Sequence, residues 1–181
     1  MHATYNTLSE PIRFQMAALL NVHLAAAIDL HAQMKQAHWN VRGAGFISIH
    51  ELFDKVAGEV ESYTDLIAER TRALGGAALG TIQIAAERSF LAPWPLEVAG
   101  VREHVFAAAA ALAAFGQSSR EAIRSAAELG DPVSAQLFTG ISRGVDQQLW
   151  LVESHADERS SETKILKICL DPAVIIEIKN G

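Results

Sequence analysis

The stretch from Phe46 to Leu74 constrains this chain more than any other part of its sequence. It contains no proline and a single glycine, so it predicts one long helix. Four side chains of the kinds that bind metals lie along it: His50, Asp54, Asp65 and Glu69. At about 100° per residue, all four fall within about 100° of one another around the axis. They therefore share one face of the predicted helix.

The length of this helix means that one copy cannot complete a metal site. Asp54 and Asp65 are eleven residues apart, which is about 16 Å along a helix axis, whereas a ligand atom lies about 2 Å from its metal. If the helix crosses a twofold-related copy in the antiparallel direction, His50 and Asp54 of one chain meet Asp65 and Glu69 of the other. The sequence thus predicts a symmetric dimer with two identical metal sites between its subunits.

Small residues near the expected crossing point, around residues 59–60, favour this arrangement. Ala57, Gly58 and Ser62 are predicted on the ligand-bearing face, and small side chains let two helix backbones approach closely. The alternative is that the carboxylates belong to an ordinary solvated face and that the histidines are incidental.

A fifth ligand comes from the end of the preceding predicted helix, where His38 reaches the same end of the molecule as His50. The set is then His38, His50 and Asp54 from one chain with Asp65 and Glu69 from the other. Imidazole and carboxylate ligands suit Fe(II) and, after oxidation, Fe(III); zinc is also compatible. The chain contains no Glu-x-x-His, which argues against the di-iron centre inside one subunit of ferritin-like carboxylate proteins.

Composition indicates one globular domain without a disulfide framework. The 181 residues are half hydrophobic and rich in alanine, which favours helices. The only cysteine, Cys169, fits a reducing compartment. The first residues do not resemble a signal peptide, and the longest apolar run, Val105 to Phe115, is too short to span a bilayer. We therefore expect a cytoplasmic protein that does not bind membranes.

The order of the predicted helices indicates the topology. Four long helices are expected at about residues 9–39, 46–74, 97–129 and 131–157. The first and last pairs are joined by short turns, whereas about twenty residues containing Pro93-Trp94-Pro95 separate the middle two. Two short connections and one long central crossover are typical of ferritin-like bundles. We predict an all-α, ferritin-like four-helix bundle whose crossover carries a short helix.

Three segments follow from this topology: a flexible N-terminal arm at 1–8, the bundle at 9–157 and a C-terminal tail at 158–181. The tail mixes lysines with a β-branched run, Val174 to Ile178. Its interpretation stays open between a short strand, a segment packed across a neighbour and a partly ordered tail.

The residues around the ligands resemble a known family. The matching positions are Lys35-Gln36-Ala37-His38-Trp39-Asn40-Val41-Arg42-Gly43, Phe46, His50, Asp54, Asp65, Ala68-Glu69-Arg70, Leu74-Gly75-Gly76, Leu79-Gly80-Thr81, Ser142-Arg143, Asp146, Leu149-Trp150 and Glu153-Ser154. They closely resemble the signature of the Dps family, the DNA-binding proteins from starved cells, also called mini-ferritins. The likeness covers about residues 9–157.

The resemblance implies both an assembly and an activity. The assembly is a homo-dodecameric shell of tetrahedral symmetry built from twofold dimers, with ferroxidase centres between subunits made by the five ligands named above. The implied activity is oxidation of Fe(II) to Fe(III), preferentially by hydrogen peroxide, with storage of a ferric oxide mineral in the cavity. Such a protein protects DNA and the cell from oxidative damage.

Residues beside the ligands carry further expectations. Trp39 is either an oxidisable side chain that traps radicals near iron or an interface aromatic. Lys35, one turn before His38, either pairs with a ligand carboxylate or belongs to the surface. Arg70 and Asp146 are expected to form a structural ion pair.

Iron entry is expected through acidic threefold pores. Glu128 and Asp131, near the start of the last predicted helix, are the pore candidates. This match to the family is looser than the match at the ligands.

The competing hypothesis is a nucleoid-associated protein that mainly binds and condenses DNA under starvation. Residues 1–9 contain no lysine or arginine, and twelve chains of formal charge −6 would together carry about −72 charges. Lys164, Lys167 and Lys179 supply positive charge in the tail, but acidic residues lie among them. The charge pattern therefore favours the iron hypothesis over the DNA hypothesis.

Overall fold

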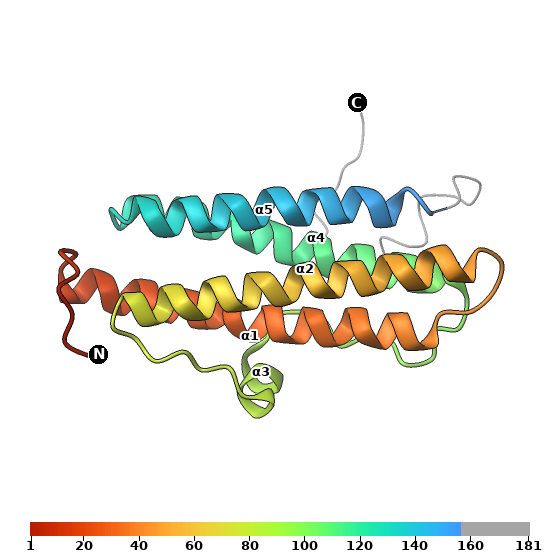
Figure 1. Cartoon of the computed structure of the whole chain (residues 1–181), viewed down its shortest axis with the longest axis horizontal. Helices are drawn as coiled ribbons and strands as arrows, with labels where there is room; N and C mark the ends of the chain where they lie inside the picture. The colour runs from red at the N-terminus through yellow and green to blue at the C-terminus, as the bar shows by residue number, and fades with distance from the viewer. Residues whose placement is uncertain (157–181) are drawn as a thin grey trace, which may run out of the picture.

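Four long helices and one short helix make up the structure, a computed structural model that describes residues 1–156 (Figure 1). Their bounds are α1 Glu10–Asn40, α2 Phe46–Ala73, α3 Ile82–Arg88, α4 Val101–Glu128 and α5 Pro132–Glu153. Within the described residues no strand is formed, and the single isolated bridge joins Arg42 to Gly100. The predicted all-α, ferritin-like bundle with a short helix in its crossover is confirmed.

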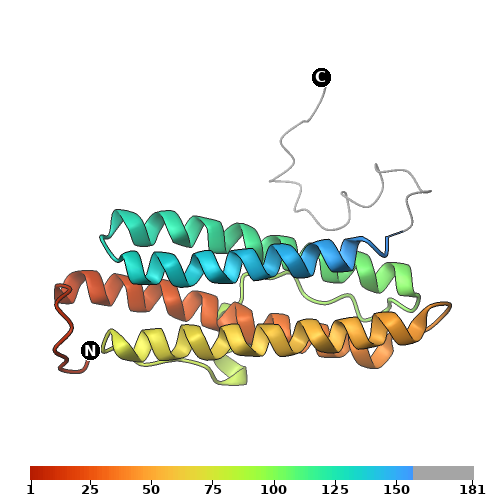
Figure 2. The ribbon, with the colours of Figure 1, turned by 45° about the horizontal axis from the view of Figure 1, so that its top comes forward.

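The bundle consists of two antiparallel helix pairs stacked on each other. Figures 1 and 2 show α1 with α2 in one layer and α4 with α5 in the other. The helices of each pair pack closely, whereas α2 and α5 touch much less. A continuous core fills the space between the layers, and its largest fully buried side chains include Phe53, Phe115 and Phe138. The crossover runs from the end of α2 along α1 to the start of α4.

The ends of the helices follow from particular residues. Gly45, with φ +74°, precedes α2, and Gly75, with φ +84°, follows its end; glycine adopts such left-handed angles without steric cost. The Asp131 side chain accepts from the Ser134 N–H and caps α5, as its sequence position predicts. Ser9 precedes α1, but its hydroxyl makes no capping bond.

Two helices are shorter than expected. Helix α4 begins at Val101 rather than near residue 97, because the Glu103 carboxylate accepts from the N–H groups of Ala99 and Gly100 and so sets the helix start there. Helix α5 ends at Glu153 rather than near 157.

The crossover and the N-terminal arm are both attached to the α1–α2 layer. Asn21 accepts from the Leu79 N–H at 2.8 Å, and Ser89 donates to Asp29 at 2.5 Å. In the arm, the His2 N–H donates to the Gly75 carbonyl at 2.6 Å. The proposed segment boundaries stay a prediction, and the tail at 158–181 lies outside the described residues.

Helix α1 is long and apolar enough to cross a membrane by length and composition alone. Half of its most apolar window is buried inside the bundle, as in the core helix of a soluble protein. Its apolar character is therefore accounted for by the core.

Candidate metal centre

The first half of the predicted site is formed by two histidines on either side of the α1–α2 turn. The rings of His38 and His50 stack with their centroids 3.7 Å apart and their planes 21° apart. Nδ1 of His38 lies 2.8 Å from the carbonyl oxygen of His50, and Nδ1 of His50 lies 2.7 Å from that of His38. Each histidine therefore holds the other in place.

This reciprocal pair determines which ring nitrogen can bind a metal. A carbonyl oxygen only accepts hydrogen bonds, so both Nδ1 atoms must carry the proton. In the neutral rings, the lone pairs of His38 and His50 then lie on Nε2. Histidines that bind metals characteristically donate their second N–H to a carbonyl or carboxylate, which orients the ring. The two Nδ1 bonds therefore orient both rings, and metal binding through their Nε2 atoms stays a prediction.

Asp54 lies beside these histidines, and its surroundings favour the ionised form of its carboxyl group. Its Oδ1 atom is 4.0 Å from Nε2 of His38 and accepts a hydrogen bond of 2.5 Å from Nζ of Lys35. That hydrogen bond, aided by the positive charge of Lys35, holds the pKa of Asp54 below its usual range. Two ligand atoms about 2.0–2.2 Å from one ion lie about 3.4 Å apart in a tetrahedral site, so the 4.0 Å between His38 and Asp54 is close to that spacing, and their binding of one metal stays a prediction.

The second half, Asp65 and Glu69, lies nearer the other end of α2. Both residues are exposed, and their carboxylates make no ion pair with any residue from 1 to 156. Over the same residues of a single chain, no three metal-binding side chains gather closely enough to hold an ion. One chain therefore presents two separate half-sites, and the pairing of each with a partner's half-site stays a prediction.

Lys35 and Trp39 lie beside the predicted ligands at the end of α1. Lys35 pairs with Asp54, and its Nζ also lies 5.8 Å from the centre of the Trp39 ring. The role of Asp54 as a metal ligand, and with it the role of Lys35, stays a prediction. Trp39 is 67% exposed in the single chain, which leaves both of its interpretations open.

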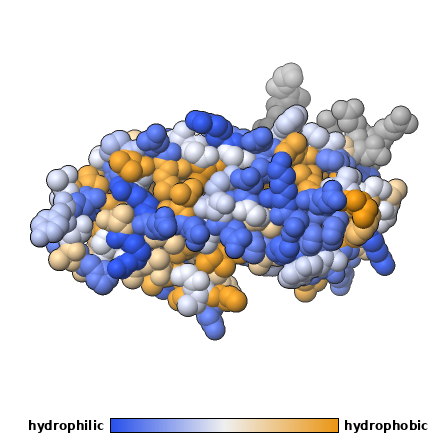
Figure 3. Space-filling model, in the orientation of Figure 1, coloured by the Kyte–Doolittle hydropathy of each residue, from blue (hydrophilic) through white to orange (hydrophobic). Residues whose placement is uncertain are grey.

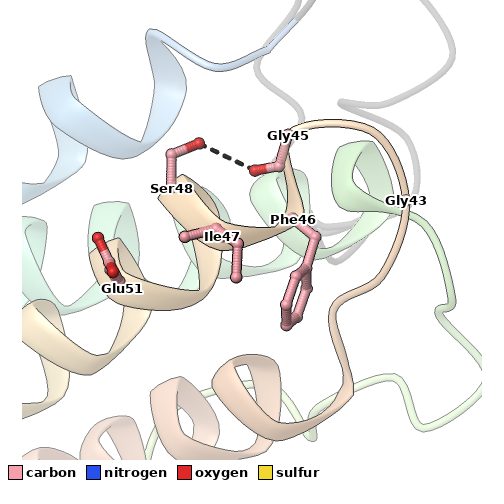
Figure 4. Close-up of a pocket in the computed structure, with 6 residues that line it drawn as sticks. All are labelled: Gly43, Gly45, Phe46, Ile47, Ser48 and Glu51. Carbon is pink, nitrogen blue, oxygen red and sulfur yellow. Dashed lines mark hydrogen bonds between the residues drawn. The ribbon is translucent and has the colours of Figure 1, made fainter.

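An open hollow of about 560 Å³ lies next to the α1–α2 turn. It is lined by Gly43, Gly45, Phe46, Ile47, Ser48 and Glu51. Figure 4 shows the Ser48 hydroxyl directed at the Gly45 carbonyl, a bond of 2.9 Å, and Phe46 directed away from it. None of the five predicted ligands lines this hollow.

Asp131 is not available to line a pore, which corrects the prediction made for it. Only 1% of the residue is exposed, and its carboxylate accepts from the Ser134 N–H at 3.1 Å and the Ser134 hydroxyl at 2.5 Å. Burial alone raises the pKa of Asp131, but the hydrogen bonds from Ser134 and Arg70 outweigh it and lower the pKa. Glu128 is exposed, and its place in a pore stays a prediction.

The expected ion pair between Arg70 and Asp146 is also wrong within the chain. Arg70 instead donates from Nη2 to both oxygens of Asp131, at 2.8 and 2.9 Å. Asp146 pairs with Arg120 at 2.8 Å across α4 and α5. Both pairs depend on the rotation of the helices about their axes, which sequence spacing does not specify.

Three aromatic side chains surround His23, one of the buried histidines of the bundle interior. His23 is packed edge-on against Phe90, Phe115 and Phe138. Its two ring nitrogens lie 2.9 Å from the Leu19 carbonyl and 3.0 Å from the Ser118 hydroxyl. Both nitrogens are occupied, so His23 is a core residue and not a ligand.

Comparisons with known proteins agree with this architecture. The family model of the ferritin-like domain matches residues 17–160. The "DNA protection during starvation protein" of Agrobacterium fabrum is 37% identical over 159 residues, which cover 88% of this chain and 98% of that protein. Among solved structures, DpsC from Streptomyces coelicolor is 30% identical with a TM-score of 0.82, covering 88% of this chain and 94% of that one. Mycobacterium smegmatis Dps, in a tetragonal crystal form, is 29% identical with a TM-score of 0.81, covering 86% and 93%. The chain belongs to the Dps family of ferritin-like proteins.

Proposed function

We propose that this protein is a ferroxidase and iron-storage cage that oxidises Fe(II), preferentially with hydrogen peroxide, and retains the ferric product. The observation that carries the proposal is the His38–His50 pair, whose reciprocal Nδ1 bonds leave both Nε2 atoms free for metal. The names of its relatives support a protective role. Removing Fe(II) and peroxide together protects DNA and the cell.

The ligand types suit the proposed substrate. In the dimer, His38, His50 and Asp54 of one chain would face Asp65 and Glu69 of its partner. Three carboxylates offset the charge of iron in both oxidation states, and the imidazoles favour binding of Fe(II). One hydrogen peroxide takes one electron from each of two Fe(II) ions and, with two protons, becomes two waters. This pairing releases no hydroxyl radical.

Exposed apolar side chains on α1, α2 and α3 support a twofold dimer. Val22 on α1, Leu66 on α2 and Ile82 on α3 are all exposed, and Figure 3 shows apolar residues gathered over α3. Gly58 is exposed, and a side chain added to it would meet no atom within 4 Å. Ala57, by contrast, is buried inside the subunit and does not belong to the crossing face. We propose that these dimers form a cytoplasmic homo-dodecamer with a ferric oxide mineral inside.

Direct DNA binding is the competing function. The formal charge of −6 and the absence of lysine and arginine from residues 1–9 weigh against it, and the name of the Agrobacterium relative speaks for DNA protection without stating direct binding. A gel-shift assay at low salt distinguishes the two functions. We expect duplex DNA to migrate freely, and retarded duplex DNA would favour the DNA-binding function.

The proposed activity is tested by replacing the second half-site. The double variant Asp65→Ala/Glu69→Ala should assemble normally, because both side chains are exposed, but should lose peroxide-driven Fe(II) oxidation. Stopped-flow absorbance of the ferric product measures the rate, and size-exclusion chromatography checks assembly. Undiminished oxidation in the assembled variant overturns the site.

A further inference from the structure

The two ligands of the second half-site lie close to the end of a helix. Asp65 and Glu69 are on the last three turns of α2, which ends at Ala73 before Gly75 and Gly76. Helix ends fray, and a metal ligand needs to be held within about 0.5 Å of its productive position. Something must therefore hold this end of α2.

Arg70, the residue after Glu69, connects this helix end to the opposite layer. Its Nε donates to the Ser134 hydroxyl at 2.9 Å, while Nη2 donates to both carboxylate oxygens of Asp131. Ser134 in turn donates to Asp131 from its hydroxyl and its N–H. The Arg70 side chain is 13% exposed and that of Asp131 is 1% exposed. The three residues form a closed, largely buried hydrogen-bonded triangle.

The direction of this contact sets the rotation of α2 about its axis. Successive residues of a helix point about 100° apart, so fixing Arg70 toward the α4–α5 turn fixes Glu69 toward the outer face. Asp65 lies one turn before Glu69 and follows the same rotation. Figure 1 shows the end of α2 and the α4–α5 turn at the same end of the bundle.

The limited contact between α2 and α5 gives this triangle its importance. Helix α2 contacts α5 far less than it contacts α1. The triangle therefore supplies a directional polar link between α2 and the start of α5, beside the apolar core to which Ile67 and the C-cap residue Leu74 of α2 contribute at this end. His38 and His50 do not need such a link, because they hold each other across the α1–α2 turn.

We propose that Arg70 is a positioning residue for the second half-site, acting through Asp131 and Ser134 on the direction of Asp65 and Glu69. This inference rests on the proposed metal centre. Groups that orient metal ligands typically change metal affinity by about 10- to 100-fold when they are removed. We expect Arg70 variants to weaken metal binding in the assembled, folded protein.

The probe in this experiment is Co(II). Its d–d absorption bands are visible in the spectrum, and it is not readily oxidised in air-saturated buffer. Arg70→Lys keeps the positive charge beside Asp131 but loses the planar fork, and Ser134→Ala removes one corner of the triangle without leaving a charge unpaired. Arg120→Met is the matched control, since it breaks the exposed Arg120–Asp146 pair elsewhere in the bundle. The full chain is titrated in its assembled form, with the unfolding midpoint measured beside it.

We expect Arg70→Lys and Ser134→Ala to raise the Kd for Co(II) by about tenfold and to alter its d–d absorption bands, with Arg120→Met unchanged. A purely structural role would lower the unfolding midpoint while leaving the Kd and the spectrum of the folded protein as in the wild type, and that result overturns the inference. Wild-type protein and Asp65→Ala/Glu69→Ala protein provide the separate test of the centre itself. If these two bind Co(II) equally, the proposed centre fails, and the positioning role fails with it.

Discussion

The two half-sites lie on the same helix, yet they are stabilised in different ways. At the first, His38 and His50 bond to each other's carbonyl groups, and Lys35 holds Asp54, all within one hairpin. At the second, the Asp65 and Glu69 side chains are exposed, and the polar link nearest to them starts from their neighbour Arg70.

This difference indicates a division of roles in the proposed dimer. The first half offers prepared nitrogen ligands, so little conformational freedom is lost when metal binds. The second half offers negative charge that becomes useful only beside a partner's histidines. We infer that the dimer, rather than the single chain, is the catalytic unit.

The largest expected effect on Fe(II) oxidation comes from a substitution that keeps the two half-sites of neighbouring subunits apart and leaves all five predicted ligands in place. Gly58→Arg places a long charged side chain at the predicted crossing point, where the single chain has open space, so the subunit should fold. If the partner helix crosses there, Fe(II) oxidation should fall by about 100-fold or more, because the half-sites no longer meet. Sedimentation velocity and stopped-flow absorbance measure association and rate.

The control for this variant is Gly140→Arg on α5, another helical glycine with no atom within 4 Å of an added side chain. It should retain dimers and activity. Full activity in Gly58→Arg would place the crossing point elsewhere.

A smaller effect is expected from Lys35, which belongs to the first half alone. Lys35→Met removes the hydrogen bond that occupies Asp54, so the pKa of Asp54 should rise toward its ordinary value while the carboxylate stays ionised near neutral pH. Divalent metal should then bind about two- to fivefold more tightly, the range expected from an exposed ion pair. Isothermal titration with Co(II) measures the change, and Lys55→Met serves as the neighbouring control. Weaker Co(II) binding in Lys35→Met would mean that Lys35 helps Asp54 to bind the metal rather than competing with the metal for its carboxylate.

The smallest effect on activity is expected at His23, whose two ring nitrogens are both occupied. Burial lowers the pKa of His23 from its ordinary value of 6.5, so the unfolded chain binds the proton more readily. The stability that His23 contributes is present above pH 6.5 and is lost as the pH falls below it, by at most about 1.4 kcal/mol per pH unit. His23→Gln should flatten this acidic decline in urea unfolding and leave Fe(II) oxidation unchanged. A loss of oxidation in folded His23→Gln would show that the interior takes part in the chemistry.

Much of the fold could be predicted from the sequence because its signals are local. The glycines at 45 and 75 and the Asp131-Pro132 pair limit helices whatever the tertiary packing. The shared face of Asp54, Asp65 and Glu69 likewise follows from helical geometry alone.

The errors arose where two helices had to be placed against each other. The sequence pattern suggests an Arg70–Asp146 pair and a pore position for Asp131, but the rotation of α2 against α5 joins Arg70 to Asp131. The reciprocal bonds of His38 and His50 do not follow from sequence spacing either, because they depend on the backbone path of the α1–α2 turn. Two histidines flanking a short glycine-bearing turn are the sequence signal that could have suggested them.

The most direct test of the intersubunit centre is complementation between two inactive variants. One carries His50→Ala/Asp54→Ala and the other Asp65→Ala/Glu69→Ala, and the two are unfolded together and reassembled in equal amounts. In a mixed dimer, one site loses all four side chains and the other keeps all of them. Random mixing places half of the dimers in this class, so about a quarter of the wild-type rate of Fe(II) oxidation should return. If the halves of the centre belonged to one chain, the mixture would stay as inactive as either variant alone.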